Sequence, residues 1–383
     1  MVEKGRDRVT GKPRDKENKG SSSVQVTAGA VQHWRGQSRA VAVEASVPFL
    51  DVPRDEEDWR FTQSFAWQDE EAQARASMEE YGFVVFRDVL SRQETQRSRH
   101  EICDYVGSKS EGFDPADEST WDAWRGGSFG MPPSDTAAYW TPQLAANRRH
   151  RHVVAGFAQL LSCPPETMRC SHDRWALYPC SLRTRRNLHL DINPFLYTGG
   201  AEVVAQARAA YPYAEASELY GGKENLISAE HGPHLQGTIA MLDNEAHDAG
   251  FICVPGSHRH FDRWAAALVA PAPGKEGGPR YDFPDHSHYS TLGQRVPVRE
   301  GSLIVWDVRL AHGSQPNLSA QGYAVRARIV QFVHLRTARQ LGEEQAARRA
   351  ALVRRLYAQH GLDEPVDPIE RAVAGLLPGG EKP

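Results

Sequence analysis

A series of short apolar segments after residue 187 most constrains the fold of this chain. The segments read "LQGTIAMLD", "GFICVPG", "GSLIVWDVRL" and "VRARIVQFVHL", and Gly, Pro or polar residues separate them. Short apolar runs bounded by turn residues in one continuous region are typical of strands in a sandwich or barrel, whereas a parallel sheet would alternate with helices. The sequence therefore predicts a mainly β fold with flanking helices, a jelly-roll or a barrel, whose core spans about 165–336.

Helical patterns precede this region. Periodic apolar residues predict a helix over 70–81 that stops at Gly82, and "FVVFRDV" then reads as a strand. Ser91 and Glu94 form a capping-box pattern that starts the next helix. Residues 144–162 are also predicted to be helical.

We divide the chain into three parts. Residues 1–45 mix basic and acidic side chains without an apolar stretch, which predicts a disordered tail. Residues 46–336 form the predicted catalytic domain, interrupted by insertions at about 196–233 and 264–292. Residues 337–383 are predicted to be a helical extension that packs on the sheet through Leu352, Leu356 and similar positions.

Composition limits the classes of function. The 383 residues are 40% hydrophobic and 25% charged, with a net charge of −4, which argues against a general nucleic-acid binder. The apolar runs are shorter than the roughly 18 residues that a membrane span needs. Five scattered cysteines without a CxxC pair predict neither a zinc ribbon nor a disulfide framework, so the cytoplasm or another reducing intracellular compartment fits best. The sequence does not indicate the oligomeric state.

The segment "NLHLD" carries the first candidate metal ligands. His189 and Asp191 stand two residues apart, so on a strand their side chains share one face. The pattern is common by chance, but His312 follows another predicted strand. Two histidines and one carboxylate suit Fe(II), because they leave three positions open, whereas zinc is more often held in a closed or nearly closed site.

Two arginines supply a second requirement. Arg326 and Arg328 follow His312 on a predicted strand, again two residues apart. A forked guanidinium beside the metal is a natural partner for the far carboxylate of a dicarboxylate cosubstrate. Which arginine reaches this carboxylate depends on a shift of a single pleat.

These pieces, in this order, resemble the phytanoyl-CoA dioxygenase family of Fe(II)- and 2-oxoglutarate-dependent oxygenases. The resemblance runs from "YGFVVFRDVLS" to about His334, and its marks are "NLHLD", "GFICVPGSH", "GSLIVWD" with the following "AHGSQPN", and "RIVQF". It implies that the mainly β fold is a cupin-like jelly-roll (double-stranded β-helix), and it implies three iron ligands: His189, Asp191 and His312.

The resemblance also implies residues around the cosubstrate. The 2-oxoglutarate arginine falls on Arg328 when "RIVQF" is aligned with the family's strand, which we prefer, or on Arg326 when the loop gap is placed differently. Ser314 adds a hydroxyl to the same carboxylate. Gln236 is expected to face inward near the cosubstrate, or to be a structural amide bonded to the backbone.

The implied reaction uses Fe(II), 2-oxoglutarate and O2 to hydroxylate a small-molecule substrate, with release of succinate and CO2. Halogenating relatives lack the carboxylate, so Asp191 argues for hydroxylation or a related oxidation. Two alternatives are an inactive jelly-roll binding protein and a zinc-dependent hydrolase with the same triad. The complete set of ligands and arginine argues against the first, and the arginine argues against the second.

Other polar residues are weaker candidates. The histidines of "EHGPH" and "DHSHY" are expected in loops or in the substrate pocket. Trp175 and Tyr178 are expected to fill the core, with the pocket as the alternative. Asp173 and Arg174 form either a buried ion pair or a substrate contact.

Overall fold

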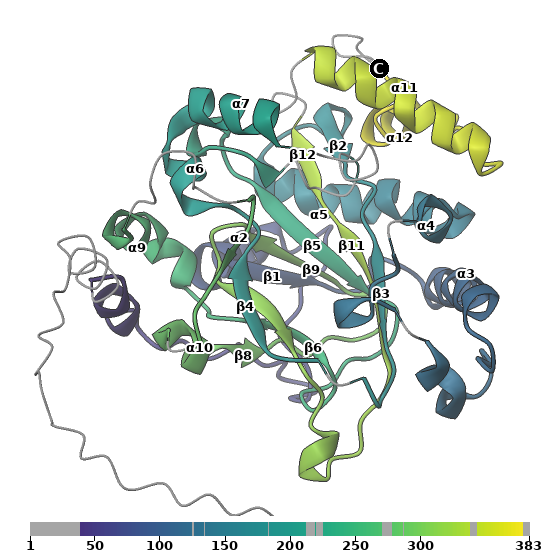
Figure 1. Cartoon of the computed structure of the whole chain (residues 1–383), viewed down its shortest axis with the longest axis horizontal. Coiled ribbons are helices and arrows are strands. Elements are labelled where there is room, and N and C mark those ends of the chain that lie inside the picture. The colour runs from purple at the N-terminus through teal and green to yellow at the C-terminus, as the bar shows by residue number, and fades with distance from the viewer. Residues whose placement is uncertain are drawn as a thin grey trace, which may run out of the picture.

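The computed structural model describes residues 39–124, 126–133, 135–182, 184–211, 219, 225–269, 278–285, 287–337 and 343–377. Two five-stranded antiparallel sheets lie at the centre of the molecule (Figure 1). The first sheet has the order β1 (Phe83–Phe86), β9 (Leu303–Asp307), β5 (Leu235–Ala240), β11 (Arg328–Val333) and β3 (Trp175–Tyr178). The second has the order β7 (Tyr281–Asp282), β4 (Asn187–Leu190), β10 (His312–Gln315), β6 (Gly250–Cys253) and β8 (Gln294–Arg295).

The chain alternates between the two sheets. Strands β3, β5, β9 and β11 belong to the first sheet, while β4, β6 and β10 belong to the second. This alternation is the double-stranded β-helix, so the predicted jelly-roll fold is confirmed. A separate two-stranded sheet pairs β2 (Met168–Cys170) with β12 (Leu335–Thr337).

Helices cover the outside of the sheets. The α-helices on either side of β1 in the sequence are α2 (Glu71–Tyr81), α3 (Arg92–Lys109), α4 (Pro142–Arg149) and α5 (Arg151–Leu161). Those between or after the later strands are α6 (Pro194–Thr198), α7 (Gly200–Ala210), α9 (Phe261–Ala267), α10 (His288–Leu292), α11 (Glu343–Gln359) and α12 (Pro368–Val373). Figure 1 shows α3 and α4 on one side of the sheets, α9 and α10 on the other, and α11 at the top.

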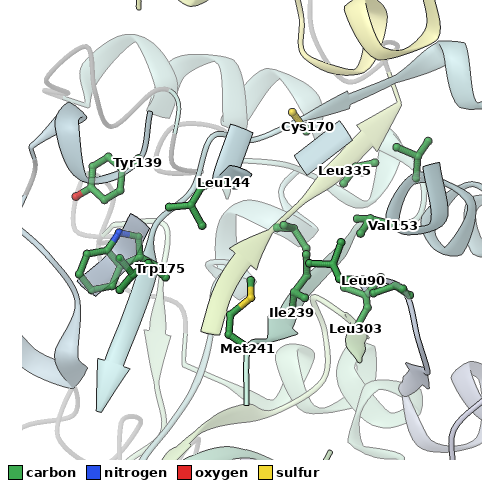
Figure 2. Close-up of a cluster of buried hydrophobic side chains, with 14 of the residues drawn as sticks. Leu90, Tyr139, Leu144, Val153, Cys170, Trp175, Ile239, Met241, Leu303 and Leu335 are labelled. Carbon is green, nitrogen blue, oxygen red and sulfur yellow. The ribbon is translucent and has the colours of Figure 1, made fainter. Parts of the chain in front are cut away.

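The side chains of the first sheet alternate between two environments, as the two-residue period of a strand requires. Ile239 and Leu303 belong to a large buried apolar cluster with Val153 of α5 and Leu144 of α4, and Figure 2 shows part of this cluster. At Gly237, an added Cβ would lie 2.9 Å from the ring of Phe157, so glycine lets α5 approach the sheet closely. The outer face of the first sheet therefore forms the core with the helices, and its inner face is left for the site.

Several predicted elements are confirmed with adjusted bounds. Helix α2 ends at Gly82, whose φ is +80°, and α3 begins with the Ser91–Glu94 capping box. The predicted helix 144–162 is two helices, because the backbone at His150 is non-helical. Leu352 and Leu356 are buried in the large apolar cluster, as predicted.

The amino-terminal prediction is partly outside the described residues. Residues 1–38, parts of both insertions and the last six residues lie there. Residues 39–45, which we predicted as tail, are helical instead. Glu44 is buried and accepts hydrogen bonds from Trp264 Nε1 (3.1 Å) and Ser287 Oγ (2.7 Å), so this segment is fixed to the second insertion.

Within the described part of the chain, no helix is long and apolar enough to cross a membrane. The five cysteines are free thiols.

Candidate metal and cosubstrate site

Two strands of the second sheet bring the predicted metal ligands together. His189 on β4 and His312 on β10 are direct partners across the antiparallel pair, and their ring centroids are 4.6 Å apart. Asp191 follows β4, with Oδ1 3.4 Å from His189 Nε2 and Oδ2 3.5 Å from His312 Nε2. One ligand atom of each residue lies within 4.8 Å of the others, and this is the one such group of three among the described residues.

Backbone carbonyls orient both histidine rings. His189 Nδ1 donates to the carbonyl of Asn187 (3.0 Å), and His312 Nδ1 donates to the carbonyl of Leu310 (2.9 Å). A carbonyl can only accept, so Nδ1 of each ring carries a proton, and Nε2 is the atom that faces Asp191 and can bind a metal. Metal-binding histidines are fixed in this way, and burial helps by lowering the pKa of His312.

Asp191 is held as a carboxylate. Burial raises its pKa, but the contacts with His189 and His312 outweigh burial and hold the pKa well below its ordinary value. Gln236 Nε2 donates to Asp191 Oδ2 (3.2 Å), while Gln236 Oε1 accepts from Trp306 Nε1 (3.1 Å). The indole N–H can only donate, so it fixes which end of the amide faces Asp191. Gln236 therefore contacts the carboxylate of the triad rather than the backbone.

The strands that carry the histidines are packed unusually closely. At Gly313, next to His312, an added Cβ would lie 1.8 Å from the carbonyl oxygen of Asn187. The side chain of Asn187 also accepts a hydrogen bond from Ser314 N (2.7 Å). A glycine at position 313 thus allows the cross-strand approach that sets the spacing of the two rings.

Arg328 lies in the same pocket as the triad. Its side chain is buried, and its guanidinium carbon is 4.9 Å from the ring centroid of Tyr178, its partner across β11 and β3. Nη1 is buried without a hydrogen-bond partner among the described residues. Burial lowers the pKa of Arg328, and Tyr178 opposes this shift. A buried cation with an unused donor is the feature expected of an anion site.

Arg326 is placed differently from the prediction. Strand β11 begins at Arg328, so the two arginines do not share a strand face. The backbone N–H of Arg326 donates to Asp248 (2.7 Å), its side chain is 57% exposed, and its guanidinium lies 3.4 Å from Glu245. Arg326 is outside the pocket that contains the triad.

Ser314 and Tyr178 bring hydroxyl groups to the Arg328 end of the pocket. Ser314 follows His312 by two residues on β10 and therefore faces the same way. Its Oγ is 3.5 Å from the hydroxyl oxygen of Tyr178. Trp175 is different, because it lies three positions from Tyr178 and points into the core, where it donates to the carbonyl of Ala138 (2.6 Å).

Asp173 and Arg174 form an ion pair and also line the pocket. Asp173 Oδ1 accepts from the backbone N–H of Arg174 (2.6 Å) and lies 3.3 Å from Arg174 Nε. His334, also in the lining, has Nε2 3.7 Å from Asp173 Oδ2. Both alternatives that the sequence left open for this pair are compatible with the structure.

The other histidine motifs lie outside the triad. His231 caps its own turn through Ser228, and His234 is buried. Neither these residues nor His288 belongs to a metal-binding group of the described residues, and His286 lies outside them.

Together these features define a class. A jelly-roll whose two sheets enclose two inward-facing Nε2 atoms, one ionised carboxylate and a buried arginine, with an N–H donor that no described residue uses, is the architecture of a non-haem metal oxygenase with an anionic cosubstrate. The donor set fits Fe(II), and the unused guanidinium donor fits a carboxylate of 2-oxoglutarate.

The family model of phytanoyl-CoA dioxygenase (PhyH) matches residues 78–326, well over half of the chain. The chain belongs to the phytanoyl-CoA dioxygenase family. It is accordingly a 2-oxoglutarate-dependent oxygenase, and the predicted family, enzyme class and cofactors, iron and 2-oxoglutarate, are confirmed.

Individual relatives are distant. A Dictyostelium discoideum protein named "Putative phytanoyl-CoA dioxygenase" is 28% identical over 270 residues, which cover 67% of this chain and 73% of that protein. The structure of GlcNAc Inducible Gene 2 of Candida albicans matches with a TM-score of 0.50 and 11% identity, over 92% of this chain and 85% of that one. The structure of EctD from S. alaskensis matches with a TM-score of 0.43 and 14% identity, over 78% and 86%.

The sequence reasoning missed several residues of the pocket. The apolar part of the lining comprises Phe129, Met131, Phe251, Trp306 and Phe332, and its polar part includes Asn187, Asn225 and Thr238. Strand parity could have found some of them, since Thr238 shares a face with Gln236, and Phe332 shares one with Arg328. Phe129 and Asn225 come from irregular segments, where no periodic signal exists.

Proposed function

We propose that this enzyme hydroxylates a small-molecule substrate, with His189, Asp191 and His312 as the ligands of Fe(II). Arg328 and Ser314 bind the far carboxylate of 2-oxoglutarate, and the products of the cosubstrate are succinate and CO2. The bound iron supplies the activation of O2 for attack on a C–H bond. The observation that carries the proposal is the buried Arg328, whose Nη1 has no protein partner in the described structure and which shares a pocket with the triad.

The chain's own residues bind and orient. The carbonyls of Asn187 and Leu310 fix the rings so that both Nε2 atoms face inward, and Gln236 holds Asp191 Oδ2. Phe251 and Trp306 pack against the ring of His312, with centroids 5.9 and 5.0 Å away, and exclude water from one side of the triad. A dry, shaped site of this kind limits side reactions of an oxidising centre.

Asp191 supports hydroxylation over halogenation, because the halogenating relatives lack this carboxylate. The zinc hydrolase alternative does not account for Arg328, since hydrolysis requires no anchor for a dicarboxylate. An inactive binding protein would not need three oriented ligand atoms, nor the carbonyls and the Gln236 amide that orient them.

An anaerobic titration tests the proposal. Adding Fe(II) and 2-oxoglutarate to the full chain should produce the weak visible charge-transfer band of the chelate, and His189→Ala should abolish it. On admission of O2, the wild type should form succinate slowly even without substrate. A wild type with neither the band nor succinate formation would disprove the proposal, and stoichiometric zinc with hydrolytic activity would favour the hydrolase.

A further inference from the structure

The inner face of the first sheet gives the pocket two ends. Arg328, Phe332 and His334 alternate along β11 and its continuation, so all three face the pocket, and the first and last are separated by roughly 20 Å of extended chain. Val333 pairs with Gly237 on the antiparallel strand β5, so the preceding residue Gln236 lies beside His334. Asp191, to which Gln236 donates, is therefore close to His334 as well. The triad therefore lies between the Arg328 end and an opposite end near His334.

Arg174 belongs to the opposite end. Its carbonyl accepts the backbone N–H of Phe332 (2.8 Å), four residues along β11 from Arg328. Its Nε faces Asp173, while Nη1 and Nη2 make no hydrogen bond to any described residue. The side chain is 38% exposed, so these four N–H donors are accessible from the pocket that Arg174 lines.

Asn225 presents a second donor to this end. Its Oδ1 accepts a hydrogen bond from Arg336 Nη2 (2.8 Å), and a guanidinium can only donate. The amide oxygen of Asn225 is therefore the atom engaged, and the Nδ2 donors remain. Asn225 lines the pocket, and Nδ2 makes no hydrogen bond to any described residue.

This end of the pocket offers unused hydrogen-bond donors. Arg174 Nε lies 3.3 Å from its ion-pair partner Asp173, and Arg336 donates to Asn225. Burial lowers the pKa of His334 to about 4, so its ring is neutral at pH 7. Among the described residues, the Nη atoms of Arg174 and Nδ2 of Asn225 therefore have N–H groups available to a ligand in the pocket, and the charge of the guanidinium suits an anion.

We propose that Arg174 and Asn225 form a subsite that binds an anionic group of the substrate, a carboxylate or a phosphate, on the side of the triad opposite Arg328. The proposal rests on the proposed function, because it assumes that 2-oxoglutarate occupies the Arg328 end. The apolar side chains of Phe129, Met131 and Phe332 in the same lining accommodate a hydrocarbon part of the substrate.

Simple probes test this subsite on the full chain. The protein is loaded anaerobically with Fe(II) and saturating 2-oxoglutarate, and then titrated with hexanoate, hexyl phosphate or the neutral hexanamide. Binding is followed by perturbation of the visible band and, independently, by ligand-observed NMR on the metal-free protein. We expect at least one anionic probe to bind about tenfold or more tightly than hexanamide, because charge-assisted hydrogen bonds to arginine are the strong ones.

Variants assign the effect to residues. Arg174→Gln should remove the preference for the anionic probe, and Arg174→Lys should restore part of it. Asn225→Asp keeps an acceptor for Arg336 but replaces the Nδ2 donor by a carboxylate oxygen. It should therefore lower the affinity for the anionic probe and leave the affinity for hexanamide unchanged. Arg280→Gln is the control, since Arg280 lines the same pocket but donates through Nε and Nη2 to Asp282.

Each outcome is decisive. Tighter binding of hexanoate would identify the anionic group as a carboxylate, and tighter binding of hexyl phosphate would identify it as a phosphate. Equal binding of hexanamide, loss of the band through displacement of 2-oxoglutarate, or sensitivity to Arg280→Gln instead of Arg174→Gln would overturn the subsite. Absence of the band before any probe is added would instead be a failure of the proposed function, so the two failures are distinguishable.

Discussion

The two ends of the pocket each contain an arginine, but the arginines are in opposite electrostatic states. Arg328 is 4% exposed, stacks on Tyr178 and has a buried donor without a partner in the described structure. Arg174 is partly exposed and already paired with Asp173. A buried cation without an anionic partner lowers the stability of the protein until an anion binds, because burial removes its hydration. A cation that is paired and partly exposed does not have this cost. We therefore expect the Arg328 end to be selective for one anion and the Arg174 end to accept a wider range of anions.

The triad between the two ends contributes the largest expected effect. We expect Asp191→Ala to lower the affinity for Fe(II) by more than about 100-fold, because it removes the one anionic ligand and leaves two neutral imidazoles. Iron content after desalting and the visible band with 2-oxoglutarate measure this. Retention of stoichiometric iron by the variant would show that the metal is held elsewhere.

Arg328 and Arg326 give the sharpest test of the cosubstrate end. Arg328→Gln should raise the dissociation constant of 2-oxoglutarate about 100-fold, or about 2.7 kcal/mol, since it removes a buried charge-assisted contact. Arg326→Gln, the matched control, should change it less than about twofold, because exposed ion pairs contribute little. Titration of the visible band provides both constants. The reverse order of effects would assign the anchor to Arg326 and contradict the comparison.

Gln236 links the triad to the first sheet, and its loss should have an intermediate effect. We expect Gln236→Leu to weaken iron binding by about 10-fold to 100-fold, as removal of groups that orient metal ligands does. Gln331→Leu is the control, because Gln331 is an equally buried amide on the other face of the sheet, bonded to Asn147 and Leu144. It should lower the melting temperature and leave the iron affinity unchanged. Equal iron affinities of the two variants would remove Gln236 from the site.

Acidification should affect the Arg174 end through His334. Its pKa is about 4 in the folded protein because of burial, against an ordinary value of 6.5. The unfolded chain binds the proton more readily, so the stability from this residue is present above pH 6.5 and is lost as the pH falls towards 4. From pH 8 to pH 5, the unfolding free energy of the wild type should fall by about 2 kcal/mol more than that of His334→Gln, which has no titrating ring at this position.

Denaturant titrations of wild type and His334→Gln at pH 8 and pH 5 measure this difference. Parallel pH dependences for the two proteins would mean that His334 is protonated or exposed in the folded state. In either case, burial would not hold the pKa of His334 below its ordinary value.

The sequence alone predicted most of the elements and singled out the three residues that we propose as metal ligands. Strand parity put His189 and Asp191 on one face, and the capping box of Ser91 and Glu94 fixed the start of α3, because both depend on neighbours within a few residues. The order of the motifs along the chain was sufficient to predict the family. All of these are local patterns, and a local pattern survives in the folded protein when nothing distant competes with it.

Only the tertiary structure separated residues that are equivalent in sequence. Arg326 and Arg328 differ because Asp248 binds the backbone N–H of Arg326 and β11 starts two residues later. Gln236 faces Asp191 because an indole from the neighbouring strand β9 fixes its amide. Such outcomes depend on which strand of which sheet lies opposite, and a pairing across tens of residues leaves no periodic trace in the chain. The enzyme class was therefore predictable from the sequence, whereas the contacts that distinguish Arg326 from Arg328 and orient Gln236 were not.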